Sequence, residues 1–81
     1  MNMETAYVFL NCDPGYEETI IKDLKSIDSI SEVCGIYGQY DIIAKVENSE
    51  RDELRKIIVC NIRKLEHVRS TLTLMRIQGQ N

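Results

Sequence analysis

Residues 5–11 constrain the fold most strongly, because their side chains are apolar on both alternating faces. In an extended strand Ala6, Val8 and Leu10 point to one side, and Tyr7 and Phe9 point to the other. Such a strand needs cover on both sides. A chain of 81 residues also has a thin core, since it buries only about 60% of the surface that its unfolded form exposes. We therefore expect a second layer within the chain and a partner surface outside it.

Helical periodicities follow the first strand and precede the last one. Asp13 and Pro14 are typical of a helix start, with Asp13 as the N-cap and Pro14 in the first turn. A buried stripe follows at helical spacing, consisting of Ile20, Ile21, Leu24 and Ile27. A second helix is expected after a capping box that runs from Ser49 to Asp52. Its core positions are Leu54, Ile57, Ile58, Ile62 and Leu65.

Three further strands complete the pattern. Residues 31–37 and 41–46 are expected to form a hairpin, with Gly38 and Gln39 as its short turn. A last strand over residues 68–77 alternates leucines with a second set of side chains. Leu72 and Leu74 fall on one face, and Thr71, Thr73 and Met75 fall on the other.

The order βαββαβ predicts one domain over residues 1–81, with an ordered core over about residues 5–77. Right-handed crossovers place both helices on the same face of one sheet. We therefore predict an α+β, ferredoxin-like fold with an antiparallel four-stranded sheet. The opposite face stays bare and includes one apolar set of the first strand, which predicts dimerisation through the sheet.

Several function classes are disfavoured by composition. Cys12, Cys34 and Cys60 are widely spaced, and the single His67 has no neighbour suited to metal binding, so we expect neither a metal nor a cofactor. No histidine is placed to activate Cys12, and no catalytic constellation is found, so we do not expect an enzyme. Free thiols, the absence of a signal peptide at the start and the short apolar runs predict a cytoplasmic protein without membrane contact.

Charge is divided unevenly along the chain. Residues 1–50 hold ten Asp/Glu and three Lys/Arg, which gives −7, and residues 51–81 hold three and seven, which gives +4. Direct nucleic-acid binding would require a basic stripe with aromatics or a recognition helix. We expect instead that the basic second helix and the acidic first helix neutralise each other, or that neutralisation occurs between subunits.

Two segments carry a resemblance to a known family. Residues 36–46, IYGQYDIIAKV, resemble the Gly-x-Tyr-Asp hairpin of the Lrp/AsnC effector domain. Residues 70–74, STLTL, resemble the last strand of that family, which has Thr at alternate positions. The resemblance covers about residues 6–77. It implies a stand-alone RAM-type domain, because full-length members also carry an N-terminal DNA-binding domain.

The resemblance also implies partners. Dimers of this family assemble into rings of four or five, so an octamer or decamer is expected, and free amino acids bind between dimers. A stand-alone member would regulate transcription by co-assembly with full-length Lrp/AsnC regulators.

An amino-acid site needs an ammonium acceptor, carboxylate donors and a side-chain pocket. We expect Asp41 to accept the ammonium group, and backbone N–H groups around Gly38 and Gln39 to bind the carboxylate. Thr71 and Thr73 are expected to present hydroxyls on the uncovered face of the sheet.

Each of these residues also has a purely structural interpretation. Asp41 could lock the hairpin through local N–H groups, and Gly38 could serve only the turn. The two threonines could reflect β-propensity alone. Tyr40 is interpreted as a packed aromatic, with a lid over the ligand as the alternative.

Two positions depart from the family pattern. Tyr37 stands where a small hydroxyl residue is common, which bears on the identity of the ligand. His67 replaces the Gly that usually precedes the last strand, and histidine tolerates a positive φ better than most residues.

Alternative functions remain open. An ACT-type domain shares this topology, and Asp13-Pro14-Gly15 partly fits its helix start, which would place the ligand near Gly15. A ligand-free structural assembly module is a further alternative. An acylphosphatase would need a basic first loop, and residues 11–15 are acidic. A small monooxygenase fits the topology only, since fold does not fix function.

Overall fold

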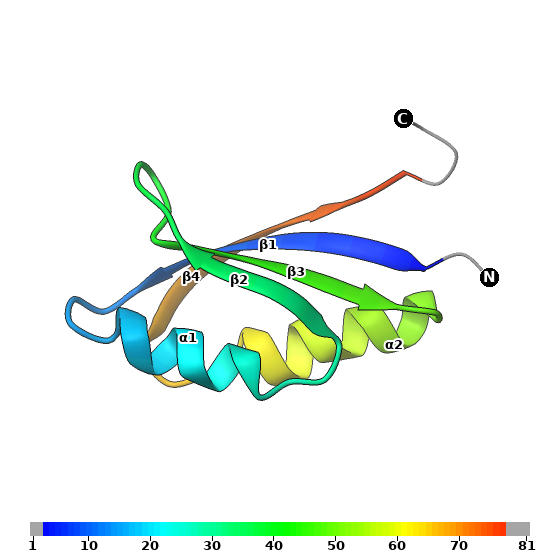
Figure 1. Cartoon of the computed structure of the whole chain (residues 1–81), viewed down its shortest axis with the longest axis horizontal. Helices are drawn as coiled ribbons and strands as arrows, with labels where there is room; N and C mark the ends of the chain where they lie inside the picture. Colours follow the sequence, from blue (N-terminus) through cyan, green and yellow to red (C-terminus); the bar gives the residue numbers. More distant parts are fainter. Residues whose placement is uncertain (1–2, 78–81) are drawn as a thin grey trace.

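The computed structural model describes residues 3–77. These residues form one sheet with two helical segments (Figure 1). The elements in chain order are β1 (Glu4–Cys12), α1 (Glu17–Lys25), β2 (Ile30–Gly35), β3 (Ile42–Asn48), α2 (Arg51–Lys56), the π-helix η1 (Ile57–Ile62) and β4 (Val68–Met75). The strands lie in the order β2-β3-β1-β4, and every neighbouring pair is antiparallel. The ferredoxin-like βαββαβ fold is therefore confirmed.

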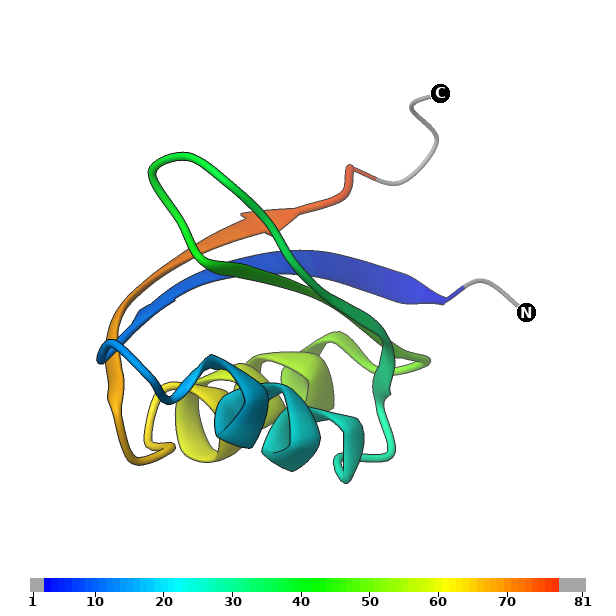
Figure 2. The same ribbon diagram turned by 60° about the vertical axis from the view of Figure 1, so that its left-hand side comes forward.

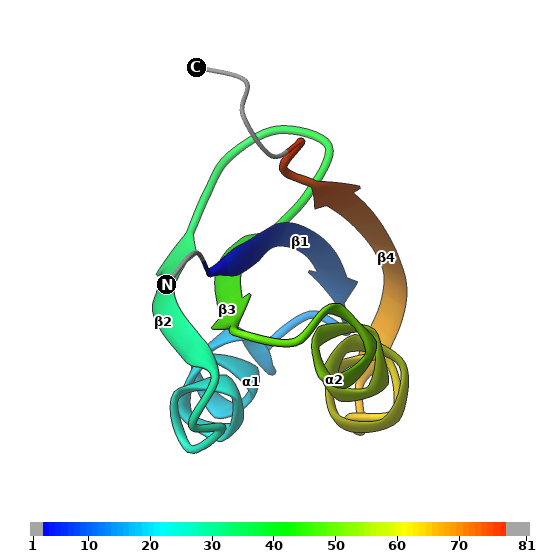
Figure 3. The same ribbon diagram turned by 90° about the vertical axis from the view of Figure 1, so that its right-hand side faces the viewer.

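Both helical segments cover the same face of the sheet, as an end-on view shows (Figure 3). On this face β1 contributes Ala6, Val8 and Leu10, which are fully buried. Side chains from β3 and from both helical segments close the core over them. The largest are Ile20, Leu24, Ile42, Leu54 and Ile62. The helical stripes expected from the sequence are thus the ones that pack on the sheet.

No helix covers the other face of the sheet within residues 3–77, and we call it the open face (Figure 3). It presents Tyr7 and Phe9 from β1, which pair directly with Leu74 and Leu72 of β4. Leu72 and Leu74 remain 43% and 50% exposed. The prediction of a bare, apolar face is confirmed, and dimerisation through it stays a prediction.

The two threonines of β4 lie on the opposite side from the one predicted. Thr71 pairs with Leu10 and Thr73 pairs with Val8, and both of these partners point into the helix-covered core. Because paired residues in an antiparallel sheet share a face, the threonines face the helices and the leucines face outward. The prediction that Thr71 and Thr73 lie on the uncovered face is wrong.

The first helix begins later than predicted, at Glu17. Residues 13–16 form a turn, in which the N–H of Tyr16 donates to the carbonyl of Asp13 at 3.1 Å. Pro14 followed by Gly15 with φ of +88° is the sequence of a type II turn. No side chain caps α1, so the predicted capping role of Asp13 is wrong.

The capping box before the second helix is also not formed. Glu50 is the N-cap of α2 and makes no side-chain capping bond. Instead, the side-chain oxygen of Asn48 accepts the N–H of Glu50 at 2.9 Å. This local Asx-type bond holds the chain at the start of α2 where the capping box was predicted.

The connection between β2 and β3 is longer than the predicted two-residue turn, because it spans residues 36–41. It projects from the sheet on the side away from the helices (Figure 2). At its base the N–H of Ile36 donates to the carbonyl of Asp41 at 2.9 Å, while the N–H of Asp41 donates to Leu10 at 2.9 Å. The backbone of Asp41 thus joins the loop to β1 and leaves residues 36–40 outside the sheet.

Candidate functional site

Asp41 lies where the β2–β3 loop enters β3, and its side chain reaches across to β1. One carboxylate oxygen, Oδ2, accepts the backbone N–H of Cys12 at 3.0 Å and lies 3.8 Å from the Cys12 Sγ. The ladder between β1 and β4 shifts register between Asn11 and Cys12. The carboxylate of Asp41 therefore binds the end of β1 at the point where the ladder with β4 becomes irregular. The second oxygen, Oδ1, has no hydrogen-bond partner within residues 3–77.

A hollow of about 430 Å³ opens beside Asp41 at this end of the sheet, and we call it the strand-end hollow. It is lined by Asn11, Cys12, Asp41, Arg69 and Ser70. The lining thus holds one carboxylate and one guanidinium group, together with neutral polar groups. The amide nitrogen of Asn11 donates to the hydroxyl of Ser70 at 3.2 Å, which fixes both side chains at the rim.

The opposite charges in the strand-end hollow define what it can bind. A carboxylate accepts bonds from an ammonium group, and a guanidinium group donates to a carboxylate. Asp41 and Arg69 form no ion pair with each other among the described residues. The ion pair of Arg69 with Asp13 uses Nε, which leaves the terminal guanidinium nitrogens for a ligand.

The thiol of Cys12 is unsuited to nucleophilic chemistry. Burial raises the pKa of Cys12 above its ordinary value of 9.0, and the negative charge of Asp41 raises it further. A reactive cysteine needs the reverse, a lowered pKa that favours the thiolate. Cys12 is therefore a neutral wall of the hollow.

Arg69 is positioned by a cluster at the β1–α1 turn. Its Nε lies 3.8 Å from Oδ1 of Asp13, and the other oxygen of Asp13 lies 3.2 Å from Nδ1 of His67. The ring of Tyr16 stacks on His67 with a centroid distance of 3.5 Å and an interplanar angle of 13°. His67 has φ of +72°, as its position before β4 predicts. His67 therefore does more than form a turn, because its contacts with Asp13 and Tyr16 connect the turn at residues 13–16 to β4.

The hairpin residues predicted to bind ligand do not line the strand-end hollow, apart from Asp41. Gly38 has φ of +121°, so the loop requires it for conformation, and Gln39 follows it in the exposed loop. Tyr40 packs against Phe9 with a ring-centroid distance of 5.6 Å and an interplanar angle of 50°. Tyr37 is fully exposed in the same loop.

The threonines of β4 line other hollows on the helix-covered side. Thr71 lines one together with Arg63, Arg69 and Ser70. Thr73 lines another between β4 and the α2–η1 segment. Of the six residues predicted from the sequence, the strand-end hollow contains Asp41 alone.

Sequence reasoning missed Asn11, Arg69 and Ser70. A usable signal existed, because β4 runs antiparallel to β1 and so begins at the sheet end where β1 finishes and β3 starts. The first charged residue of β4 is Arg69, which this topology places at the same end of the sheet as Asp41. Cys12 was considered only as a nucleophile, which left its role as a hydrogen-bond partner of Asp41 unrecognised.

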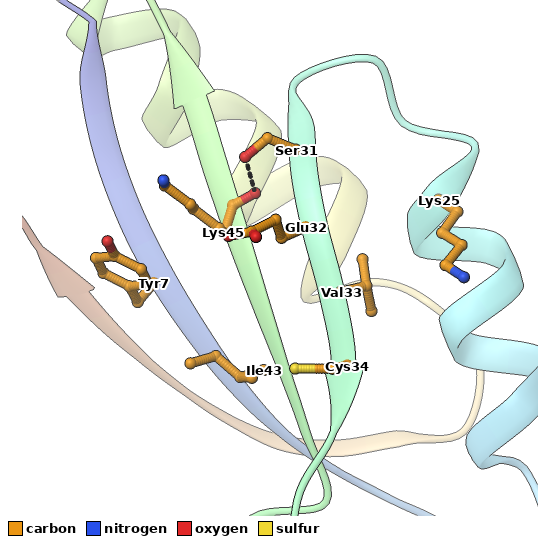
Figure 4. A pocket seen from close by; sticks show the side chains of 8 residues that line it. All are labelled: Tyr7, Lys25, Ser31, Glu32, Val33, Cys34, Ile43 and Lys45. Carbon is orange, nitrogen blue, oxygen red and sulfur yellow. Dashed lines mark hydrogen bonds between the residues drawn. The ribbon is translucent and has the colours of Figure 1, made fainter.

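A larger hollow, about 450 Å³, lies along the edge strand β2 (Figure 4). On the open face it is lined by Tyr7, Glu32, Cys34, Ile43 and Lys45, while Val33 and Lys25 lie on the α1 side. It contains none of the predicted ligand-binding residues. Its aromatic and aliphatic lining continues the apolar patch of the open face.

Within residues 3–77, no group of three or more His, Cys, Asp or Glu side chains is placed to hold a metal ion. None of the helices in the same part of the chain is long and apolar enough to cross a membrane.

Comparison with known proteins identifies relatives of two kinds. Residues 5–78 match the Lrp/AsnC ligand binding domain. The structure superposes on the crystal structure of FFRP-DM1 with a TM-score of 0.88 and 30% sequence identity, covering 91% of this chain and 99% of that one. It also superposes on E. coli AsnC with a TM-score of 0.85 and 22% identity, covering 94% of this chain and 52% of AsnC.

The second kind of relative is an enzyme. The chain is 39% identical over 69 residues to the homocitrate synthase of Saccharolobus islandicus, a match that covers 84% of this chain. This chain spans only 15% of the length of that relative.

The match to the ligand-binding domain extends over nearly the whole chain, and the FFRP-DM1 superposition covers both chains almost completely. The resemblance expected from the hairpin and the last strand is thereby confirmed. This chain belongs to the Lrp/AsnC ligand-binding domain family.

Proposed function

We propose that this chain is a regulatory domain that binds a free amino acid in the strand-end hollow. The observation that carries the proposal is the presence of Asp41 and Arg69 in one hollow. An α-amino acid presents an ammonium group and a carboxylate on adjacent carbon atoms. The free Oδ1 of Asp41 would accept the ammonium group, and Arg69 would bind the carboxylate.

Asp41 would serve the fold and the ligand at the same time. Its Oδ2 is used by the N–H of Cys12 at 3.0 Å. This bond fixes the carboxylate without consuming Oδ1. A preorganised acceptor reduces the ordering that ligand binding would otherwise require.

The lining favours a polar ligand side chain over a branched aliphatic one. Asn11 and Ser70 are polar, and Cys12 is small. An aliphatic side chain would desolvate the amide and hydroxyl groups without giving them new partners, which is unfavourable. In an oligomer a second subunit would add further wall, as the resemblance to the family implies.

The open face supplies the assembly surface in this proposal. Tyr7, Phe9, Leu72 and Leu74 form an apolar patch on one side of the sheet. Packing two such faces together would bury them, and dimers would then build the octamer or decamer. Five residues remain proposed ligand contacts only across subunits, since they lie outside the strand-end hollow: Gly38, Gln39, Tyr40, Thr71 and Thr73.

The proposed output is regulation and not catalysis. Cys12 is held as a neutral thiol, because burial and Asp41 raise its pKa. We propose that the domain co-assembles with full-length Lrp/AsnC regulators and makes their DNA binding depend on the amino acid.

A panel of melting temperatures tests the proposal. The protein is melted with each of the twenty amino acids at millimolar concentration, alongside Asp41→Asn. Ligand at a hundred times its Kd adds about 2.7 kcal/mol, which shifts the Tm of a small domain by several degrees. A rise for a few polar amino acids, lost in Asp41→Asn, supports the proposal. A flat panel with ligand-free protein favours the structural assembly module.

The homocitrate synthase match supports a second candidate. A segment of that enzyme is 39% identical to this chain, so we propose as an alternative that the domain regulates a metabolic enzyme. In a test, this chain replaces the matching segment of the Saccharolobus islandicus enzyme. Inhibition of the chimera by the amino acid that raises the Tm supports this candidate, and an insensitive but active chimera contradicts it.

A further inference from the structure

A second concave surface runs along the free edge of β4, on the helix-covered side. One hollow of about 330 Å³ is lined by Arg55, Ile58, Val59, Arg63, Thr73 and Met75. We call it the β4 groove. Arg63 also lines the neighbouring hollow with Arg69 and Thr71, so the two adjoin along the strand. β4 is an edge strand, so no further strand covers this side within residues 3–77.

The arginines of the β4 groove carry uncompensated charge. Among the described residues, the ion pairs are those of Asp13 with His67 and Arg69. Arg55 and Arg63 therefore have no acidic partner there, and no Asp or Glu lines the groove. The predicted neutralisation between the two helices is not formed inside the chain. The groove is left with a positive rim.

The floor of the groove is apolar. Ile58 and Met75 pack at the edge of the core, and Val59 remains 45% exposed. The π-helix forms one wall of the groove through Ile58 and Val59, and the N–H of Arg63 donates to the carbonyl of Ile58 at 3.0 Å across five residues. Single π-type segments are rare and occur often at functional sites.

We propose that the β4 groove binds an apolar monocarboxylate that lacks an ammonium group. Arg55 and Arg63 would take the carboxylate, because a guanidinium group matches its geometry and charge. The hydroxyl of Thr73 would add a donor, and Ile58, Val59 and Met75 would contact the aliphatic body. An amino acid fits poorly here, because its ammonium group would meet two cations and no carboxylate among the lining side chains.

The ligand class is thus opposite to that of the strand-end hollow. Asp41 in that hollow provides a carboxylate for an ammonium group, and no carboxylate lines the β4 groove. The strand-end hollow and the β4 groove share no lining residue, so carboxylate binding in the groove does not depend on Asp41 or Arg69. Thr73, proposed above as an amino-acid contact across subunits, is the residue that the two proposals have in common.

A matched ligand pair tests the inference by amide NMR titration. The probe is 4-methylpentanoate, which is leucine without its ammonium group, and the comparisons are leucine itself and the neutral 4-methylpentanamide. We expect saturable shifts at the amides of Thr73, Met75 and η1 with the probe at millimolar concentration. The two comparison ligands should leave these amides unchanged.

Charge-removing variants locate the carboxylate. Arg55→Gln and Arg63→Gln should each lower the affinity for the probe by roughly tenfold. The control is Arg51→Gln, which removes the same charge from α2, the helix that carries Arg55, outside the groove lining. It should leave the affinity unchanged. Because these side chains are exposed, each variant should keep a folded amide spectrum.

Three outcomes would overturn the inference. The first is an absence of saturable shifts at the groove with the probe. The second is equal saturation of the same amides by leucine, which would contradict the ligand class. The third is an equal loss of affinity in Arg51→Gln, which would show attraction by general charge and no built site.

Discussion

The two faces of the sheet come from the same four strands, yet they differ in whether their apolar side chains are buried. On the helix-covered face Val8 and Leu10 are fully buried, and the β4 residues beside them are Thr73 and Thr71. On the open face β4 presents Leu72 and Leu74, which are half exposed. A chain that folded only for itself would turn these leucines inward and the threonines outward.

The difference indicates that the helix-covered face stabilises the subunit, whereas the open face is suited to contact a partner. The helix-covered face is buried within one chain, so its packing needs no partner. The open face leaves a contiguous apolar patch, which usually marks an interface. Comparing substitutions on the two faces can therefore separate folding from assembly.

The largest expected effect is on the helix-covered face. Leu10→Ala should lower the free energy of unfolding by about 2–5 kcal/mol, because it leaves a cavity in the core. Urea unfolding followed by circular dichroism measures this loss. The loss should be the same at low and high protein concentration, and a strong concentration dependence would contradict the assignment of this face to the single chain.

The next effect belongs to the open face. Leu72→Asp should dissociate the proposed oligomer while leaving the subunit folded, because a leucine buried in the interface would contribute about 1.5–3 kcal/mol. Sedimentation velocity gives the assembly state, and circular dichroism gives the fold. Val59→Asp is a matched control, since Val59 is a similarly exposed apolar residue on the helix side. The comparison of faces would fail if Val59→Asp dissociated the assembly and Leu72→Asp did not.

A smaller effect is expected at the strand end. Asp41→Ala should cost about 1–3 kcal/mol, because it leaves the N–H of Cys12 without its acceptor. Asp41→Asn keeps an oxygen at that position and should cost much less. Thermal unfolding of both variants measures the difference. Equal losses would mean that the bond to Cys12 does not stabilise the strand end.

The smallest effect concerns pH. Burial raises the pKa of Cys12 in the folded protein above its ordinary value of 9.0. The folded state then binds the proton more tightly than the unfolded state, so this contribution is fully present below pH 9.0 and is lost as pH rises above it. The urea midpoint should fall between neutral and alkaline pH in both proteins, and the fall should be larger for the wild type than for Cys12→Ala. A parallel fall in both proteins would contradict a role for this thiol.

The element order was predictable from the sequence, because period-2 and helical patterns alternate clearly along the chain. The double-sided apolar pattern of residues 5–11 also predicted a bare face. Alternation alone could not tell which face of β4 the helices cover. That depends on the register, which pairs Thr71 with Leu10 and leaves Leu72 opposite Phe9.

The candidate site was only partly predictable for a related reason. Asp41 was identified from the hairpin motif, but its neighbours come from β1 and β4, which are distant in sequence. Arg69 became part of the site through the antiparallel topology. The loop at residues 36–41 could not be sized from Gly38 alone, because the bonds of Asp41 to β1 set its length.

The most direct measurement is a titration calorimetry cycle at Asp41. The amino acid that raises the Tm most and its analogue without the ammonium group are each titrated into the wild type and Asp41→Asn. We expect the analogue to bind the wild type roughly tenfold to a hundredfold more weakly, since a charge-assisted bond contributes about 1.5–3 kcal/mol. In Asp41→Asn the two ligands should bind with nearly equal affinity. An unchanged difference in the variant would show that Asp41 does not receive the ammonium group, and the account of the strand-end hollow would be wrong.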